Sequence, residues 1–118
     1  MIIGVGVDLV DLTRFENKLV ATPALIERIF TESERSAKAE SLAGYWAAKE
    51  ALIKALGNPA GLNWHDVSVT KDDLGKPALN VSGATLERAT ELGIAKWHLS
   101  ISHDGGMAVA FVIAESGA

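Results

Sequence analysis

Apolar residues fill most of the first ten positions of the chain, and Ile2 to about Val10 is expected to form a buried β-strand. Two alternating apolar runs near the C-terminus, "AKWHLSISH" and "MAVAFVIAE", flank the segment "DGG", which is a strong signal for a β-hairpin. A second hairpin is expected from a short strand at Val67 to Lys71 and the return strand "PALNV". The segment "KDDLGKP" between these strands is rich in turn-forming residues.

Helix start and stop signals divide the rest of the chain into one long helix and several short ones. The long helix is expected to run from Ser41 to the stop signal Gly57-Asn58-Pro59. Thr31 and Glu34 have the spacing of a capping box, so "FTESE" is expected to begin a helix of its own. The other expected helix starts are Asp11 or Thr13, Thr22-Pro23, and Ser82, whose helix ends at about Leu92 before Gly93. The order of elements predicts an α+β fold, in which a mainly antiparallel sheet packs with one long helix and several short ones.

The first strand carries an unusual face. Side chains alternate along a strand, so Gly4, Gly6 and Asp8 share one face. Glycine and aspartate are both depleted in strands, and a face of two glycines lets another group approach the backbone closely. Asp8 could belong to a site at this face, or it could simply cap the segment that follows the strand. The "GVG" is not a dinucleotide fingerprint, because Leu9 stands where the third glycine should be.

The expected long helix contains "WAAKEALIKALG", which is apolar almost all the way round. At about 100° per residue, Glu50 and Lys54 are neighbours on a flank that also carries Trp46 and small alanines, and Lys49 points elsewhere. An acid and a base at this spacing commonly form a surface ion pair. No broad polar face surrounds this pair, so a position in the wall of a binding site is favoured over a surface ion pair. If Asp8 and Glu50 converge, two carboxylates could hold one Mg²⁺ and Lys54 could complement a phosphate.

Composition and charge narrow the possible function classes. The chain has 118 residues, with 48% hydrophobic and 22% charged, which suggests one globular domain over residues 1–118. The absence of cysteine excludes thiol catalysis and zinc–thiolate sites, so a metal is expected to have oxygen ligands. The net charge of -4 argues against general nucleic-acid binding. No apolar run is long enough to span a membrane and no signal peptide is recognisable, so we expect a soluble, cytoplasmic protein.

The last hairpin carries hydroxyl groups and a histidine. Ser100 and Ser102 share one strand face with His98, and His103 lies on the other face. The serines could bind a phosphate or could hydrogen-bond to neighbouring strands. "SHD" is not a catalytic triad, because three consecutive strand residues cannot point at one another. Lys76 in "DLGKP" lies at a turn, where a solvated lysine is the ordinary case.

Five segments occur in this order along the chain: "GVGVDLVDLTRF", "FTESE", "WAAKEALIKALG", "GKP" and "HLSISHDGGMAVAFVI". Together they closely resemble the holo-(acyl-carrier-protein) synthases, the short bacterial type of 4'-phosphopantetheinyl transferase, over nearly the whole chain. The resemblance implies the fold of that family and a magnesium-dependent reaction that supports fatty acid biosynthesis. In this reaction the phosphopantetheine arm of coenzyme A moves to a serine of an apo acyl carrier protein, and adenosine 3',5'-bisphosphate is released.

The same resemblance implies roles for particular residues. Asp8 and Glu50 would bind Mg²⁺ and Lys54 would contact the phosphates, so these three are the expected catalytic residues. Arg14 would dock the carrier protein, with Lys18 helping. The family forms homotrimers with active sites between subunits. The nucleotide end of coenzyme A is expected beside Gly75, Lys76, Pro77, Ser100, Ser102 and His103.

Two departures from the family pattern affect these expectations. Many relatives carry an arginine where this chain has Tyr45, so one positive contact is missing. The stretch after "FTESE" is also shorter than in many relatives, and glutamates balance the bases of the early helices, which weakens steering of an acidic carrier. Both a free carrier protein and a carrier domain of a larger synthase therefore stand as candidate partners.

Two other functions are compatible with the residues alone. Asp8, Glu50 and Lys54 would equally serve a magnesium-dependent phosphohydrolase acting on a nucleotide. A non-catalytic trimeric binding module would need none of these side chains for turnover. The fate of an apo carrier protein distinguishes transfer from hydrolysis, because only transfer adds mass to the carrier.

Overall fold

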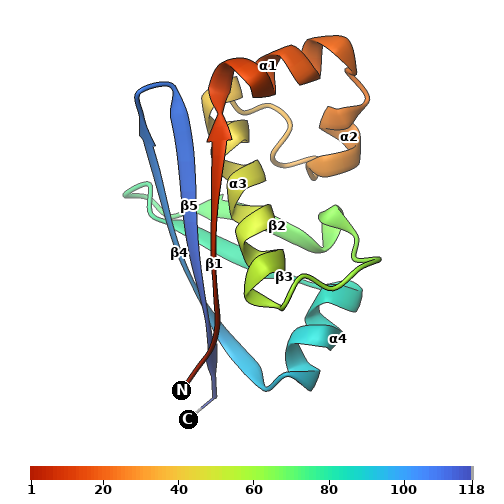
Figure 1. The fold of residues 1–118 in the computed structure, drawn as a ribbon, viewed down its shortest axis with the longest axis vertical. Coiled ribbons are helices and arrows are strands. Elements are labelled where there is room, and N and C mark those ends of the chain that lie inside the picture. Colours follow the sequence, from red (N-terminus) through yellow and green to blue (C-terminus); the bar gives the residue numbers. More distant parts are fainter. Residues whose placement is uncertain (118) are drawn as a thin grey trace.

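The computed structural model describes residues 1–117, and Ala118, the last residue of the expected domain, lies outside them. Apart from one expected helix that is absent, the elements follow the order that the sequence pattern predicts, with strands at both ends of the described chain (Figure 1). They are β1 (Ile2–Asp11), α1 (Leu12–Ala21), α2 (Leu25–Ile29), α3 (Ala39–Ala55), the 3₁₀ helix η1 (Trp64–Asp66), β2 (Val67–Lys71), β3 (Pro77–Val81), α4 (Gly83–Glu91), β4 (Ile94–Asp104) and β5 (Met107–Ser116).

The larger sheet has the strand order β1-β5-β4 and is antiparallel throughout. β4 and β5 form the expected C-terminal hairpin, and β1 pairs with β5 so that Asp8 lies opposite Ala110. β2 and β3 form the second expected hairpin as a separate two-stranded sheet. Helix α3 lies against β1 and β5 and covers one face of the larger sheet (Figure 1). The predicted α+β class, with a mainly antiparallel sheet and one long helix, is confirmed.

Small residues bring α3 very close to the sheet. A Cβ atom added at Gly4 would lie 2.1 Å from the carbonyl oxygen of Ala55, and one added at Gly6 would lie 1.8 Å from that of Ala51. Both distances are far below van der Waals contact, so only glycine fits at either position. The close approach expected at the Gly4–Gly6 face is therefore made by the backbone of α3. This contact places Asp8, on the same strand face, beside the helix.

The opposite side of α3 is held by a buried ion pair. Lys49 and Glu34 have fully buried side chains, and Lys49 Nζ lies 2.9 Å from Glu34 Oε1. Lys49 also donates hydrogen bonds to the carbonyl oxygens of Trp64, at 3.2 Å, and Val67. Burial lowers the pKa of Lys49, and the hydrogen bond and charge of Glu34 oppose that shift. Lys49 thus points away from Glu50 and Lys54, as the helical periodicity predicts.

The helix expected at "FTESE" is absent, and this prediction is wrong. Residues 31–38 form successive turns, and α3 begins at Ala39, two residues before the expected Ser41. Part of the capping box does form, because the Thr31 amide donates to Glu34 Oε1 at 2.9 Å. The other carboxylate oxygen of Glu34 accepts from the amide of Val69 at 2.8 Å. Glu34 therefore serves as a buried counter-ion for Lys49, and its carboxylate joins the turn to β2 instead of starting a helix.

Other boundaries differ by a few residues. Asp11, one of the two expected starts, caps α1, and its Oδ1 accepts from the Arg14 amide at 2.9 Å. The helix expected after Thr22-Pro23 begins only at Leu25, because Pro23 and Ala24 form a turn. Within residues 1–117, none of the helices has the length and apolar character needed to cross a membrane.

Candidate active site

Asp8 and Lys54 meet at the contact between β1 and α3. Lys54 Nζ lies 3.1 Å from Asp8 Oδ1 and also donates to the carbonyl oxygen of Val7 at 3.0 Å. The Asp8 side chain is 18% exposed and the Lys54 side chain 48% exposed, so the pair sits at the edge of the solvent. The glycines that precede Asp8 on β1 allow this contact, because they bring the strand onto the helix backbone.

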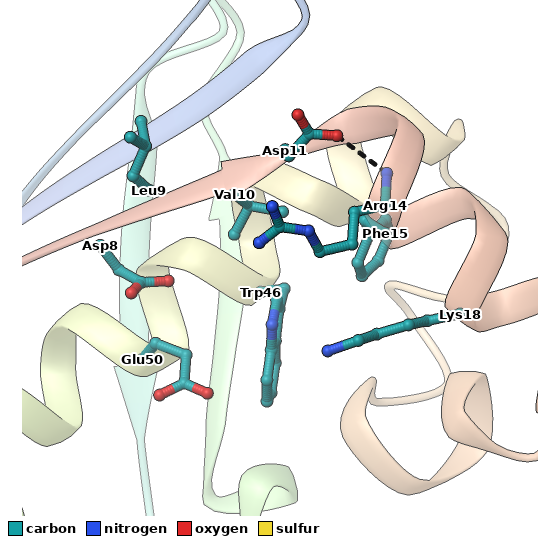
Figure 2. Close-up of a pocket in the computed structure, with 9 residues that line it drawn as sticks. All are labelled: Asp8, Leu9, Val10, Asp11, Arg14, Phe15, Lys18, Trp46 and Glu50. Carbon is teal, nitrogen blue, oxygen red and sulfur yellow. Dashed lines mark hydrogen bonds between the residues drawn. The ribbon is translucent and has the colours of Figure 1, made fainter.

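Glu50 lies one helical turn before Lys54 and faces the same region. Burial raises the pKa of Glu50, and the negative charge of Asp8 raises it further, whereas Lys54 and Lys18 act in the opposite direction. Asp8 and Glu50 also line one cavity, with both carboxylates at the same end of it (Figure 2). The convergence that the sequence left conditional is therefore present in the fold.

Asp8 and Glu50 line a cavity of about 280 Å³ between β1, α1 and α3, and Lys54 is not among its lining residues (Figure 2). Asp8 and Glu50 occupy one end, and the side chains of Arg14 and Lys18 extend over the other end from α1 (Figure 2). The cavity therefore has an acidic end and a basic end. Its lining residues are Asp8, Leu9, Val10, Asp11, Arg14, Phe15, Lys18, Trp46 and Glu50.

The donor set fits magnesium better than a metal that requires an all-protein cage. Within residues 1–117 no group of three or more histidine, aspartate or glutamate side chains is arranged to hold a metal. Asp8 and Glu50 supply two carboxylates whose repulsion a cation would relieve. Mg²⁺ is commonly held by one or two carboxylates, with water and substrate phosphates completing its shell. The acidic end of the cavity therefore fits a magnesium ion that is bound together with a phosphate-bearing substrate.

A second cavity, of about 130 Å³, lies on another side of α3 and brings together part of the expected nucleotide-binding set. Gly75, Pro77 and His103 line it, whereas Lys76 is not among its lining residues within the described chain. The His103 ring packs against α3 at Gly44, and its Nε2 donates to the carbonyl oxygen of Glu40 at 2.9 Å. The other lining residues are Ser41, Gly44, Tyr45, Lys71 and Ile101.

Ser100 and Ser102 do not join this cavity. Both are exposed, and they alternate along β4 with Leu99 and Ile101, which pack against the core. The two serines therefore lie on the outer face of the sheet, opposite to the face that carries His103. The alternation predicted this separation, so the implied set of nucleotide-binding residues is divided between the two faces of β4.

The outer face of the larger sheet is apolar and uncovered. Val5 is 55% exposed, Val7 is 52% exposed, and Phe111, which pairs with Val7 on β5, is 42% exposed. Ile3 and Leu9 continue the row along β1 at 37% and 61%. A contiguous apolar surface of this kind usually marks an interaction site. We call these five residues the outer apolar face.

Sequence reasoning did not identify Trp46 or Lys71 as cavity residues. Trp46 lies on the same helix flank as Glu50, and this position could have indicated a cavity residue. A tryptophan at such a position is equally typical of the hydrophobic core. Its ring packs edge-on against Trp64, with 4.8 Å between centroids, and also forms a wall of the larger cavity. Lys71 ends a short strand, and nothing in the local pattern indicates that its side chain turns toward Tyr45 on α3.

A family model and close relatives match almost the whole chain. The model of the 4'-phosphopantetheinyl transferase superfamily matches residues 4–112. The chain is 51% identical to a holo-[acyl-carrier-protein] synthase of Salinispora arenicola, over 98% of this chain and 99% of the relative. It is 49% identical to the synthase of the same name from Clavibacter michiganensis, over 100% and 99% of the two chains.

A solved structure has the same fold. The holo-[acyl-carrier-protein] synthase of Helicobacter pylori in complex with coenzyme A superposes with a TM-score of 0.83 at 32% identity. The match covers 94% of this chain and 99% of the other.

Proposed function

Because the chain belongs to the 4'-phosphopantetheinyl transferase superfamily, we propose that it is a magnesium-dependent holo-(acyl-carrier-protein) synthase. It transfers the phosphopantetheine arm of coenzyme A to a serine of an apo acyl carrier protein. The observation that carries the proposal is that Asp8 and Glu50 line one cavity and Lys54 pairs with Asp8 at 3.1 Å, on a chain similar over its full length to synthases of that name. The similar Helicobacter pylori synthase was solved with coenzyme A bound.

The reaction requires the enzyme to stabilise negative charge, and the carrier serine supplies the nucleophile. The hydroxyl oxygen of the carrier serine forms a bond to the phosphorus that bears the pantetheine arm. The bond from that phosphorus to the bridging oxygen breaks, adenosine 3',5'-bisphosphate leaves, and the serine proton passes to the surrounding solvent. Negative charge grows on the bridging oxygen and redistributes over the non-bridging oxygens as this happens. A cation beside these oxygens lowers the barrier because it is positioned before the charge develops.

Three side chains of this chain meet that demand. Asp8 and Glu50 would hold the magnesium ion, which when bound would supply positive charge to the phosphate oxygens. Lys54 lies beside the same carboxylates and carries a further positive charge toward the phosphates.

Mass spectrometry of the carrier protein tests the activity directly. The full-length protein, Mg²⁺, coenzyme A and an apo carrier protein are mixed, and the carrier is expected to gain the mass of phosphopantetheine. Cleavage of coenzyme A with an unmodified carrier would instead identify a phosphohydrolase. Asp8→Asn and Glu50→Gln should each abolish magnesium-dependent transfer, with native circular dichroism. Glu91→Gln, which alters an exposed carboxylate on α4, is the matched control. Full activity of both site variants would refute the roles of Asp8 and Glu50, and a wild-type protein with no turnover would support a binding module instead.

Carrier docking is proposed for the basic end of the larger cavity. Arg14 and Lys18 lie on one face of α1, and Lys18 and Arg28 also edge an adjacent cavity of about 250 Å³. Leu25 and Ile29 make that adjacent cavity largely apolar. Its basic edge and apolar interior suit an apolar side chain flanked by acidic residues of a carrier protein. Arg14→Ala should raise the KM for the carrier and leave the KM for coenzyme A unchanged, and an unchanged carrier KM would refute the docking role.

A homotrimer is proposed for the assembled enzyme. The outer apolar face would be covered by neighbouring copies, and the two cavities on different sides of α3 could then contribute to active sites between subunits. Light scattering should give three times the chain mass of 12.5 kDa. Val7→Asp should reduce that mass, whereas Val20→Asp, at an exposed position outside the face, should not. A wild-type monomer would refute the trimer.

A further inference from the structure

One lysine of α1 lines two neighbouring cavities. The larger cavity, which contains the proposed metal site, is lined by Lys18 together with Asp8 and Glu50. The adjacent cavity of about 250 Å³, which is proposed to dock the carrier, is lined by Lys18 and Arg28. Arg14 lines only the larger cavity and Arg28 only the adjacent one. Within residues 1–117, Lys18 is therefore the one cationic side chain that the two cavities share.

The rest of the shared wall is apolar and held in place. Phe15 and Trp46 line both cavities, and the Lys18 side chain extends from α1 toward the Trp46 ring (Figure 2). Phe15 packs edge-on against Phe30, with 6.3 Å between ring centroids, and Trp46 packs in the same way against Trp64 at 4.8 Å. Lys18 is exposed, and a lysine ammonium group sits on a flexible four-carbon stem. Lys18 is thus the movable part of a wall whose other side chains are packed.

The charge of Lys18 acts on the proposed metal site. Burial and the charge of Asp8 raise the pKa of Glu50, whereas Lys54 and Lys18 lower it. These two lysines are held differently. Lys54 Nζ is fixed between Asp8 Oδ1 at 3.1 Å and the carbonyl oxygen of Val7 at 3.0 Å. Lys18 takes part in no ion pair in the described part of the chain. Lys18 is therefore the positive charge that a docked partner can draw away from the site.

We propose that Lys18 couples carrier docking to magnesium binding, because its ammonium group serves the acidic end of the larger cavity in the free protein and acidic residues of the carrier once the carrier docks. This inference rests on the proposed function. A lysine beside Asp8 and Glu50 opposes the binding of another cation there, since like charges repel. Pairing with the carrier neutralises that lysine, so the docked carrier raises the affinity for Mg²⁺. By linkage, Mg²⁺ raises the affinity for the carrier by the same factor. The metal is then held most tightly when the acceptor serine is present.

Calorimetry measures this coupling without turnover. Mg²⁺ is titrated into the full-length protein saturated with adenosine 3',5'-bisphosphate, with and without a saturating apo carrier, at low ionic strength. This nucleotide has no pantetheine arm, so no transfer occurs. Titrations of Mg²⁺ into carrier and nucleotide without the protein are subtracted. The carrier should tighten Mg²⁺ binding about twofold to fivefold, the size expected for an exposed charge pair. The effect should shrink at high salt, which screens exposed charges.

Variants of the two cavities separate coupling from docking. Lys18→Met should tighten Mg²⁺ binding to the carrier-free protein about twofold to fivefold, and a saturating carrier should then leave the affinity for Mg²⁺ unchanged. Lys18→Arg keeps the charge and should keep the coupling. Arg28→Met should weaken carrier binding but preserve the coupling factor at saturating carrier, because Arg28 does not line the larger cavity. Arg88→Met, which removes an exposed charge on α4, should change neither quantity.

The outcomes distinguish this inference from the proposed function. If Lys18→Met leaves the Mg²⁺ affinity of the carrier-free protein unchanged, or responds to the carrier as wild type does, the role of Lys18 is overturned even in an active transferase. If the wild-type protein modifies no carrier in the mass spectrometry assay, the proposed function fails. The carrier-free titrations of Lys18→Met and wild type then still decide whether Lys18 opposes Mg²⁺ at Asp8 and Glu50.

Discussion

Replacing Lys49 by methionine should destabilise the protein by about 3–5 kcal/mol, the usual loss when one member of a buried ion pair is removed. Methionine has a similar length, so the change removes charge and hydrogen bonds with little change in volume. Glu34 would keep its bonds to the amides of Thr31 and Val69 but would lose its counter-charge in a fully buried position. The carbonyl oxygens of Trp64 and Val67 would also lose a donor.

The expected change in melting temperature follows from the size of the chain. Unfolding entropy near 60 °C is about 2.1 cal/mol/K per residue, or about 0.25 kcal/mol/K for 118 residues. A loss of about 3–5 kcal/mol therefore lowers Tm by about 12–20 °C. Circular dichroism melts at one fixed protein concentration measure this, because assembly makes Tm depend on concentration.

Two control variants make the K49M experiment diagnostic. The double variant Glu34→Leu/Lys49→Met removes both charges, and it should recover most of the lost stability, because apolar replacements of buried pairs are often neutral. Lys38→Met, at an exposed position before α3, should change stability by less than about 0.5 kcal/mol. A Tm within about 3 °C of wild type for Lys49→Met would refute the role assigned to the pair. A loss of kcat at temperatures where the variant is fully folded would refute the assignment of Lys49 to structure instead of catalysis.

Three further predictions concern the site and its frame. Glu50→Gln should raise Tm at pH 7 without divalent ions, because burial and Asp8 raise the pKa of Glu50 and its ionised form opposes folding. The gain in Tm should fade as the pH falls through that raised pKa toward 4.5. Melts across this range would refute the prediction if the difference in Tm between variant and wild type stayed constant. Gly6→Ala should lower Tm and kcat together, since the added methyl group would meet the Ala51 carbonyl at 1.8 Å and push α3 from β1; Gly117→Ala, with only ordinary contacts, is the control. Asp66→Ala should cost about 0.5–2 kcal/mol in denaturant unfolding, because Asp66 Oδ2 accepts from the Thr85 amide at the start of α4.

Elements defined by local patterns were predictable. β1 was expected from Ile2 to about Val10 and ends at Asp11, and β2 has the expected bounds Val67–Lys71. Alternation along β4 also separated His103 from Ser100 and Ser102 correctly. These features depend on neighbours within a few residues, where period and turn chemistry dominate.

Features that depend on distant partners were not predictable from one segment. The capping-box spacing at Thr31 predicted a helix, and the hydrogen bond from the Thr31 amide to the Glu34 carboxylate does form. The turn stays non-helical because Glu34 is also required by Lys49, 15 positions along the chain, and by the amide of Val69. The contact between Lys71 and Tyr45 is of the same kind, since a strand end and a helix meet only in the folded chain.

The active site combines both kinds of information. Periodicity placed Glu50 and Lys54 on one flank and Lys49 on another, but only the fold shows what holds each flank in place. Gly4 and Gly6 bring β1 onto the side of α3 that carries Glu50, and the Glu34 ion pair anchors Lys49 on a different side. Lys49 and Glu50 are adjacent in sequence, so a rotation of α3 by one residue, about 100°, would exchange a structural cation for the carboxylate proposed to bind the metal. The glycine contact and the buried pair oppose such a rotation from two sides, and the geometry of Asp8 and Glu50 therefore depends on both.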